Sequence, residues 1–367
     1  MAKKHVLKPK AAAKPFSLLA QLAVALIIIA GATLISWRLV ASASHQVSYI
    51  PEKLSDCQKS ATKNYDCYAK YYATMAYEQG NAATFKDMEA AYATDDFVKS
   101  QCHQLSHIVG RTSFEKTGSL EKAYAQGDNF CWSGFYHGAI EQAVKKMGAA
   151  AIIRNANTVC KSFADAQKYS FNHFNCVHGL GHGLMAVSDY KLPDALKLCD
   201  NLKDSWEQSS CYGGVFMENV MVASRNDGTN AYFKANEPLY PCTFVNYRYK
   251  EQCYLMQTSY ILQHNGYDFA ETFRQCSMAD SGFADTCYRS AGRDASGSTV
   301  SDVALTVANC RKAGDNADAV YNCMLGADRD FVSYFHSTDR ANELCEAFGG
   351  SLTVSCKQDV ASYYTTF

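Results

Sequence analysis

The sixteen cysteines of this 367-residue chain fall into eight consecutive couples, and this pattern constrains the fold more than any other feature. From Cys199 onward each couple encloses about a dozen residues, and successive couples begin about 34 residues apart. An even number of cysteines at regular spacing is typical of a disulfide framework, and a fixed period is typical of a repeat protein. Zinc sites usually contain closely spaced Cys-x-x-Cys pairs, and the chain has none. The predicted disulfides join Cys57 to Cys67, Cys102 to Cys131, Cys160 to Cys176, Cys199 to Cys211, Cys242 to Cys253, Cys276 to Cys287, Cys310 to Cys323 and Cys345 to Cys356.

The amino-terminal segment predicts a membrane anchor. Residues 1–15 contain five lysines and no acidic residue, and residues 16–37 are uncharged and mostly apolar. A segment of that length can cross a bilayer, and lysines in front of it favour a cytoplasmic amino terminus. We therefore predict a cytoplasmic tail over 1–15, a single transmembrane signal anchor over 16–37 and a linker over 38–54. The sequence Ala41-Ser42-Ala43 resembles a signal-peptidase site, so cleavage of this segment is the alternative.

The remaining body is predicted to lie outside the cytoplasm, in the periplasm or the extracellular space, because disulfides persist there. The chain contains no Asn-x-Ser/Thr acceptor for N-glycosylation, which favours a bacterial envelope. Six of the 35 Lys and Arg residues and none of the 36 acidic residues lie in the first 38 positions, which leaves the body with a net charge of −7. An acidic body without a basic run argues against nucleic-acid binding.

The body is predicted to be entirely helical. Only four of the six prolines follow residue 37, and proline is the residue that helix interiors exclude. Apolar residues at helical spacing precede the first cysteine of each couple and follow the second, with polar, turn-forming residues between them. The predicted fold is therefore an all-α solenoid of helix–loop–helix repeats, in which a disulfide joins the end of one helix to the start of the next. We place amino-terminal repeats over 55–230 and carboxy-terminal repeats of the same solenoid over 231–367.

Aligning the second cysteines brings further residues into register. Gly134, Gly179 and Gly214 each stand three residues after a cysteine, and His137 and His182 each stand six residues after one. In a solenoid, equivalent positions of successive repeats form a column along one surface. Glycines inside helices are unfavourable, so they indicate either close packing of neighbouring helices or the approach of a ligand to the backbone. Both explanations remain open at this point.

Histidines and glutamates gather in the early repeats, often four residues apart and therefore on one helix face. Two such side chains can hold one metal ion between them. The predicted metal ligands are His103, His107, His137, His178 and His182. Glu141 and Glu218 are predicted as further ligands or as a catalytic general base. Imidazole and carboxylate donors suit Zn, Fe, Cu or Mn. The alternative is that each histidine is a hydrogen-bonded packing residue.

Three functions agree with these features. The first is a metal-dependent hydrolase or oxygenase, in which the metal ion activates water or dioxygen. The second is metal binding or metal sensing without catalysis. The third is an interaction scaffold of the cell envelope, whose concave face binds a peptide, a glycan or a protein. The two metal-dependent functions require the five imidazoles to converge in the folded protein, whereas the scaffold does not.

Overall fold

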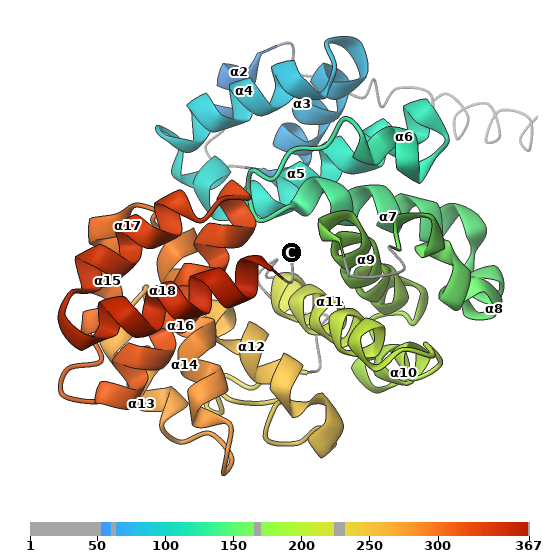
Figure 1. Cartoon of the computed structure of the whole chain (residues 1–367). Helices are drawn as coiled ribbons and strands as arrows, with labels where there is room; N and C mark the ends of the chain where they lie inside the picture. Colours follow the sequence, from blue (N-terminus) through green and yellow to red (C-terminus); the bar gives the residue numbers. More distant parts are fainter. Residues whose placement is uncertain (1–52, 60–63, 165–169, 224–231, 366–367) are drawn as a thin grey trace, which may run out of the picture. The chain divides into compact units, whose positions relative to one another are not determined.

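The computed structural model describes residues 53–59, 64–164, 170–223 and 232–365 (Figure 1). The predicted cytoplasmic tail, the anchor over 16–37 and nearly all of the linker lie outside the described residues. Within the described ranges, no helix has the length and the apolar character that crossing a membrane requires. The description below concerns the compact unit of residues 51–367 alone.

The described residues form helices and no strands, as predicted. A series of mostly long helices forms the inner row, in which each member packs against the next. This row contains α3 (Tyr65–Glu78), α5 (Asp96–Thr117), α7 (Gly134–Met147), α9 (Phe171–Val187), α11 (Ser205–Ala223), α12 (Tyr247–His264), α14 (Ala284–Gly297), α16 (Ala317–Phe335) and α18 (Gly350–Tyr364). Mostly shorter helices pack beside it: α2 (Leu54–Gln58), α4 (Asn81–Tyr92), α6 (Leu120–Tyr124), α8 (Ala149–Val159), α10 (Leu192–Cys199), α13 (Phe269–Cys276), α15 (Val303–Arg311) and α17 (Asp339–Phe348), with a 3₁₀ turn at Lys161–Phe163. The repeat-like character of the fold is therefore confirmed.

Local sequence explains where several of these helices begin. The side chain of Asp268 accepts a hydrogen bond from the backbone of Glu271 at the start of α13, and Asp302 does the same for Leu305 at the start of α15. Such caps satisfy backbone N–H groups that have no partner within the helix. Pro193 occupies the first turn of α10, where its missing N–H and fixed φ are tolerated. Residues that lie between the second cysteine of one couple and the first cysteine of the next thus start these helices.

All eight predicted disulfides are formed, with Cα–Cα distances of 5.4 to 5.8 Å. In the second half of the chain each bond connects a shorter helix, or the turn before α12, to the following inner helix. The second cysteine usually lies inside this helix and not at its start, since α11 begins at Ser205 and contains Cys211. The side chain of Asp204 explains the earlier start, because it accepts hydrogen bonds from the backbones of Trp206 and Glu207.

Glycines let neighbouring inner helices approach to backbone contact. A Cβ atom on Gly138 of α7 would lie 2.0 Å from the carbonyl oxygen of His107, and one on Gly110 of α5 would lie 1.9 Å from that of Phe135. The same reciprocal arrangement joins α9 to α11 through Gly181 and Gly214, and α14 to α16 through Gly292 and Gly326. Close packing is therefore the correct explanation for these glycines. It also brings side chains on α5, α7, α9 and α11 unusually close together.

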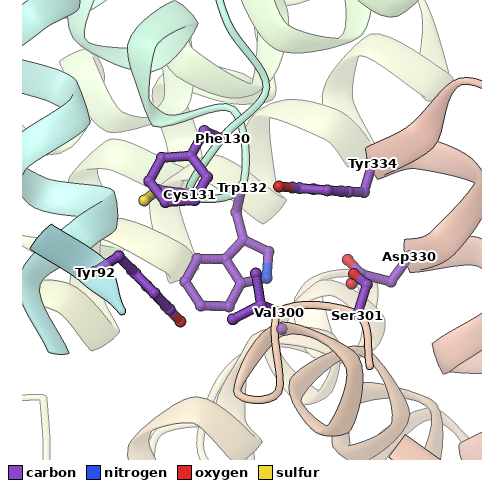
Figure 2. A pocket seen from close by; sticks show the side chains of 9 residues that line it. Tyr92, Phe130, Cys131, Trp132, Val300, Ser301, Asp330 and Tyr334 are labelled. Carbon is purple, nitrogen blue, oxygen red and sulfur yellow. The ribbon is translucent and has the colours of Figure 1, made fainter. Parts of the chain in front are cut away.

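The inner row returns toward its own beginning. The segment between α6 and α7 meets α14 and α16: the Asn129 side chain lies 2.9 Å from Nε2 of His336, and the Trp132 ring packs on Gly297. Figure 2 shows Trp132 beside residues of these carboxy-terminal helices and the loop that follows α14. Residues 129–132 and 297–336 thus make contacts that an open solenoid with a free concave face would lack.

Candidate metal centre

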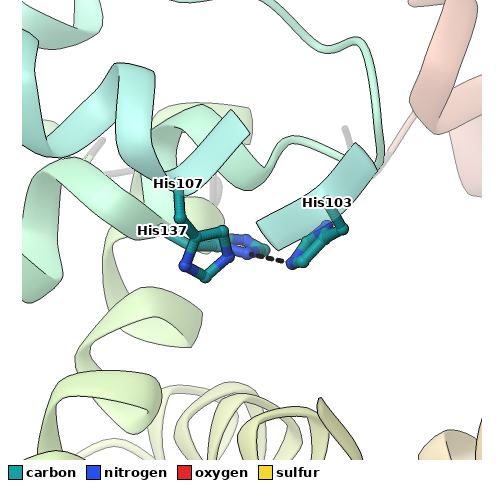
Figure 3. Close-up of side chains that lie close together, drawn as sticks. All are labelled: His103, His107 and His137. Carbon is teal, nitrogen blue, oxygen red and sulfur yellow. Dashed lines mark hydrogen bonds between the residues drawn. The ribbon is translucent and has the colours of Figure 1, made fainter. Parts of the chain in front are cut away.

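Five histidines converge where α5, α7 and α9 pack against one another. His103 and His107 come from α5, His137 from α7, and His178 and His182 from α9. The imidazole centroid of His137 lies 5.2 Å from that of His103, 4.8 Å from that of His178 and 4.9 Å from that of His182. Figure 3 shows His103, His107 and His137 facing one another. The structure therefore brings together the same five side chains that were predicted from the sequence to be metal ligands.

The cluster is buried, and burial favours the neutral form of four of its rings, those of His103, His107, His137 and His178. The exposed fraction is 0% for His107 and His182, 2% for His137 and 3% for His178. Burial lowers the pKa of His103, His137 and His178 well below the usual value, and mutual repulsion between the rings acts in the same direction. Burial lowers the pKa of His107 too, although Glu141 opposes this shift. The neutral imidazole is the form that binds metal ions.

Acceptors around the cluster occupy one nitrogen of several rings. His103 Nδ1 lies 2.8 Å from the carbonyl oxygen of Cys131, and His182 Nδ1 lies 2.9 Å from Oε2 of Glu218. His107 Nδ1 lies 2.9 Å from Oε1 of Glu141. Because a carbonyl or carboxylate oxygen can only accept, the ring proton belongs on Nδ1 and the lone pair on Nε2. Histidines that bind metals are commonly oriented in this way.

Besides Nδ1 of His107, which forms an ion-pair contact with Glu141 but no hydrogen bond, three ring nitrogens in the cluster have no hydrogen-bond partner among the residues that the structure describes. They are Nε2 of His107, Nε2 of His178 and Nε2 of His182. A buried acceptor without a partner costs about 1–3 kcal/mol, so three of them in one place are a substantial cost to folding. Nitrogen lone pairs that face the interior without a donor are suited to a cation.

The pairing of His103 with His137 is the most informative contact. The Asn175 amide nitrogen donates to the carbonyl of Phe171 at 3.0 Å, which orients its Oδ1 toward His137 Nε2 at 3.2 Å. His137 must therefore carry its proton on Nε2 and a lone pair on Nδ1. That Nδ1 lies 3.4 Å from His103 Nε2, which also carries a lone pair because Nδ1 donates to Cys131. Two lone pairs face each other and need a proton or a cation between them.

The two predicted acids lie beside ring nitrogens that carry protons. Glu141 contacts His107, and its Oε2 accepts from Nη2 and Nε of Arg111 at 2.6 and 3.0 Å. Burial opposes ionisation of Glu141, but His107 and Arg111 hold its pKa well below the usual value. Glu218 bonds to His182. In this arrangement both carboxylates orient and polarise imidazoles.

Sequence reasoning missed the acceptors that set the orientation of the rings. Asn175 lies on α9, three residues before His178, and the spacing alone could have placed it on the face of the cluster. The Cys131 carbonyl has no sequence signal, because it belongs to a turn in which Cys131, Trp132 and Ser133 have φ of 58°, 54° and 60°. Left-handed conformations cost about 1–2 kcal/mol per non-glycine residue, so tertiary contacts must hold this turn.

The other described histidines lie outside the cluster. His173 is on α9 as well, but its Nε2 contacts Glu207 at 3.0 Å. His264 contacts the backbone carbonyl of Tyr260 in its own helix at 2.8 Å. His336 follows α16 and contacts Asn129, as described above. Only the five histidines at the positions predicted to bind metal therefore converge among the described histidines.

Comparison of the chain with protein-family models, curated proteins and solved structures finds no match.

Proposed function

We propose that this protein binds a transition-metal ion through ring nitrogens of His103, His107 and His137. One potential ligand atom from each of these residues lies within 4.8 Å of the other two. The single observation that carries the proposal is the approach of His103 Nε2 to His137 Nδ1 at 3.4 Å, with a lone pair on each. Two nitrogens bound to one tetrahedral zinc ion at about 2.0–2.1 Å lie about 3.3–3.4 Å apart. The observed separation matches that geometry.

A second group of ligands adjoins the first. Ring nitrogens of His137, His178 and His182 also lie within 4.8 Å of one another, and His137 belongs to both groups. Nε2 of His178 and of His182 is buried without a partner among the described residues. These two rings can complete the coordination of one ion or contribute to the binding of a second one. Metal content per chain distinguishes the two arrangements.

The donor atoms restrict the metal. Imidazole nitrogens suit Zn, Cu, Ni and ferrous Fe, whereas Mn prefers carboxylate and water oxygens. The nearby carboxylates of Glu141 and Glu218 contact imidazole nitrogens, and Glu141 also binds a guanidinium. We therefore favour zinc, copper or iron over manganese.

Burial favours binding of a metal ion over turnover of a large substrate. Four of the five rings are at most 3% exposed. The two pockets described for this protein are lined by other residues and by none of the five histidines. A reaction at this centre would be confined to molecules as small as water or dioxygen, so metal binding without turnover of a larger substrate is the function that the geometry supports best.

We also propose that the body lies outside the cytoplasm, tethered by an anchor over 16–37. The support is eight disulfides, which an oxidising compartment maintains. Labelling with a membrane-impermeant thiol reagent cannot test this location, because none of the cysteines in the described residues is free. Protease digestion of spheroplasts, in which the outer face of the cytoplasmic membrane is accessible, does, since it should remove a carboxy-terminal tag on this body.

The metal proposal predicts stoichiometric metal in the purified full-length protein. After chelation, dialysis against zinc, copper or ferrous iron should restore at least one equivalent per chain by elemental analysis. The double variant His103→Ala/His137→Ala removes the facing lone pairs and should bind less than a tenth of an equivalent. The matched control is His173→Ala, a buried histidine on α9 whose partner is Glu207, and it should retain the metal.

Two results would contradict this proposal. One is a folded wild-type protein that takes up none of the three metals. The other is a double variant that keeps the wild-type metal content, because the ion would then bind elsewhere. Metal should also raise the melting temperature of the wild-type protein and not that of the double variant, since a ligand of the native state stabilises it by mass action.

Loss of the Cys102–Cys131 disulfide should weaken metal binding about tenfold or more, because the bond holds the left-handed turn whose Cys131 carbonyl orients His103. The change is Cys102→Ala/Cys131→Ala, measured by competition with a chromophoric chelator. The control Cys57→Ala/Cys67→Ala removes a disulfide between α2 and α3, which carry no cluster histidine. It should lower stability and leave the affinity unchanged; equal affinity losses in the two variants would refute a specific role for the turn.

A further inference from the structure

One metal ion cannot reach all five rings of the cluster. The histidines divide into two groups of three, and within each group one ligand atom per residue lies within 4.8 Å of the others. His103 and His107 belong to the first group, His178 and His182 to the second, and His137 to both. Two rings bound to one tetrahedral ion have their centroids about 5 Å apart. The His103 centroid lies 5.2 Å from that of His137 but 6.4 Å from that of His182, so one ion fits either group and not both.

His137 presents a different nitrogen to each group. Its Nδ1 lies 3.4 Å from Nε2 of His103 on α5 (Figure 3). Its Nε2 lies 3.2 Å from Oδ1 of Asn175, which belongs to α9, the helix that also carries His178 and His182. The two nitrogens of an imidazole point away from opposite sides of the ring and can each bind a ligand. The His137 ring is therefore placed between the two groups, with one nitrogen directed to each.

Helix α9 offers its polar side chains on the face that meets His137. Asn175, His178 and His182 are three and four residues apart, so they share one side of the helix. Nδ1 of His182 is held by Glu218 at 2.9 Å, and His178 forms a hydrogen bond with the backbone of Ser210. Nε2 of both rings is buried and has no partner among the described residues. Their centroids are 5.3 Å apart, which suits two rings that bind one ion.

We propose that the centre holds two metal ions and that His137 bridges them, which rests on the metal binding proposed above. The first ion binds the first group through Nδ1 of His137. The second ion binds four atoms from α7 and α9: Nε2 of His137, Nε2 of His178, Nε2 of His182 and Oδ1 of Asn175. Two ligand atoms at about 2.0–2.2 Å from one ion lie about 3–3.4 Å apart. The 3.2 Å between His137 Nε2 and Asn175 Oδ1 agrees with that spacing.

Negative charges within and beside the centre favour two cations there. When the second ion binds, His137 gives its Nε2 proton to solvent and becomes an imidazolate, which has a lone pair on each nitrogen and a negative charge. Glu141 and Glu218 contact His107 and His182, and both carboxylates are largely shielded from solvent. Buried charges are tolerated only where they are paired. The imidazolate and the two carboxylates therefore offset part of the charge of two ions in a site without exposed ligands on α7 and α9.

Copper loading of the full-length protein tests the bridge without any variant, since imidazole ligands suit cupric ions. After chelation, dialysis against cupric sulfate should give two equivalents per chain by elemental analysis, and zinc sulfate should do the same. Two cupric ions joined by an imidazolate couple antiferromagnetically. The integrated electron paramagnetic resonance signal at low temperature should therefore be severalfold smaller than the copper content. Loading with equal amounts of copper and zinc should restore much of the signal per copper ion.

Variants on α9 test the second ion separately. His178→Ala/His182→Ala removes two of its ligands and should retain one equivalent of copper, with a signal that matches the copper content. Asn175→Ala should weaken binding of the second equivalent about tenfold or more and leave the first unchanged. The control His173→Ala changes a buried histidine of the same helix whose partner is Glu207, and it should keep both equivalents and the weak signal.

The outcomes separate this proposal from the function on which it rests. A folded wild-type protein that takes up no metal would overturn both. One equivalent in the wild type, unchanged in the His178→Ala/His182→Ala variant, would overturn the second ion and leave the first. Two equivalents with a signal equal to the copper content would overturn the bridge, because the ions would then bind without sharing His137.

Discussion

Lowering the pH from 7 to 5.5 should reduce the free energy of unfolding of the metal-free protein by on the order of 1 kcal/mol. The main cause is the group of cluster histidines whose pKa burial lowers, His103, His107, His137 and His178. Burial shifts the pKa of His336 in the same direction. The folded state keeps these rings neutral, while the unfolded chain takes up protons below pH about 6.5. Their contribution to stability is therefore complete above this pH and is lost as the pH falls.

Carboxyl groups whose pKa is raised by burial act in the opposite direction; Asp328 and Asp330 show the largest of these shifts, and Asp87 and Glu89 shift in the same direction. Burial raises the pKa of Asp328 to about 9 and that of Asp330 to about 6, so the folded protein binds protons there that the unfolded chain releases. Each ring that stays neutral in the folded state costs about 1 kcal/mol between pH 7 and 5.5, and the histidines together outweigh the carboxyls. Glu141 has a lowered pKa and loses its contribution only at pH values below this window.

Urea denaturation with the disulfides intact and a chelator present measures this effect. The variant His137→Gln should lose about 1 kcal/mol less than the wild type over the same pH interval, because one neutral ring is absent. The control His264→Gln changes an exposed histidine outside the cluster and should follow the wild type. A pH dependence that is identical in His137→Gln and the wild type would mean that the cluster does not titrate as described. Saturating metal should steepen the loss below pH 6.5, since protons compete with the metal for the rings.

Replacement of Gly214 by alanine should destabilise the protein by about 3 kcal/mol or more. The new Cβ atom would lie 1.8 Å from the carbonyl oxygen of His178, an atom of the helix backbone that cannot move aside without separating α9 from α11. Because His178 and His182 lie on α9, the same displacement should weaken metal binding. Few single substitutions affect both fold and site so directly.

The neighbouring residue provides a closely matched control. At Gly213 the nearest atom to a new Cβ is the Gln252 side-chain oxygen at 3.0 Å, which is the end of a flexible side chain. Replacing Gly213 by alanine removes a helical glycine, which favours the helix, and adds strain against Gln252, which opposes it. We therefore expect Gly213→Ala to lower the free energy of unfolding by less than about 1 kcal/mol in total. Thermal and urea unfolding of the two variants measure the difference. Equal stabilities would show that α9 and α11 are not in backbone contact.

Local spacing allowed the disulfides to be predicted, because cysteines roughly a dozen residues apart have few other partners within reach. Periodic apolar residues and scarce proline likewise predicted the helices. The i, i+4 spacing placed His103 with His107 and His178 with His182 on shared faces. The register of the cysteines extended this to His137. These inferences succeed because they depend on the geometry of a single helix or a short loop.

Tertiary structure alone decided how far the helices approach and which atoms the imidazoles face. Spacing did not reveal the reciprocal glycine contacts, such as that of Gly138 with His107, which bring α5 and α7 close enough for the cluster to form. Nor did it reveal that the side-chain oxygen of Asn175 determines which nitrogen of His137 carries the proton, or that Trp132 and Asp330 line the same pocket. The physical reason is range. A helix fixes the relation between residues three or four apart, whereas contacts between separate helices depend on the packing of the whole core.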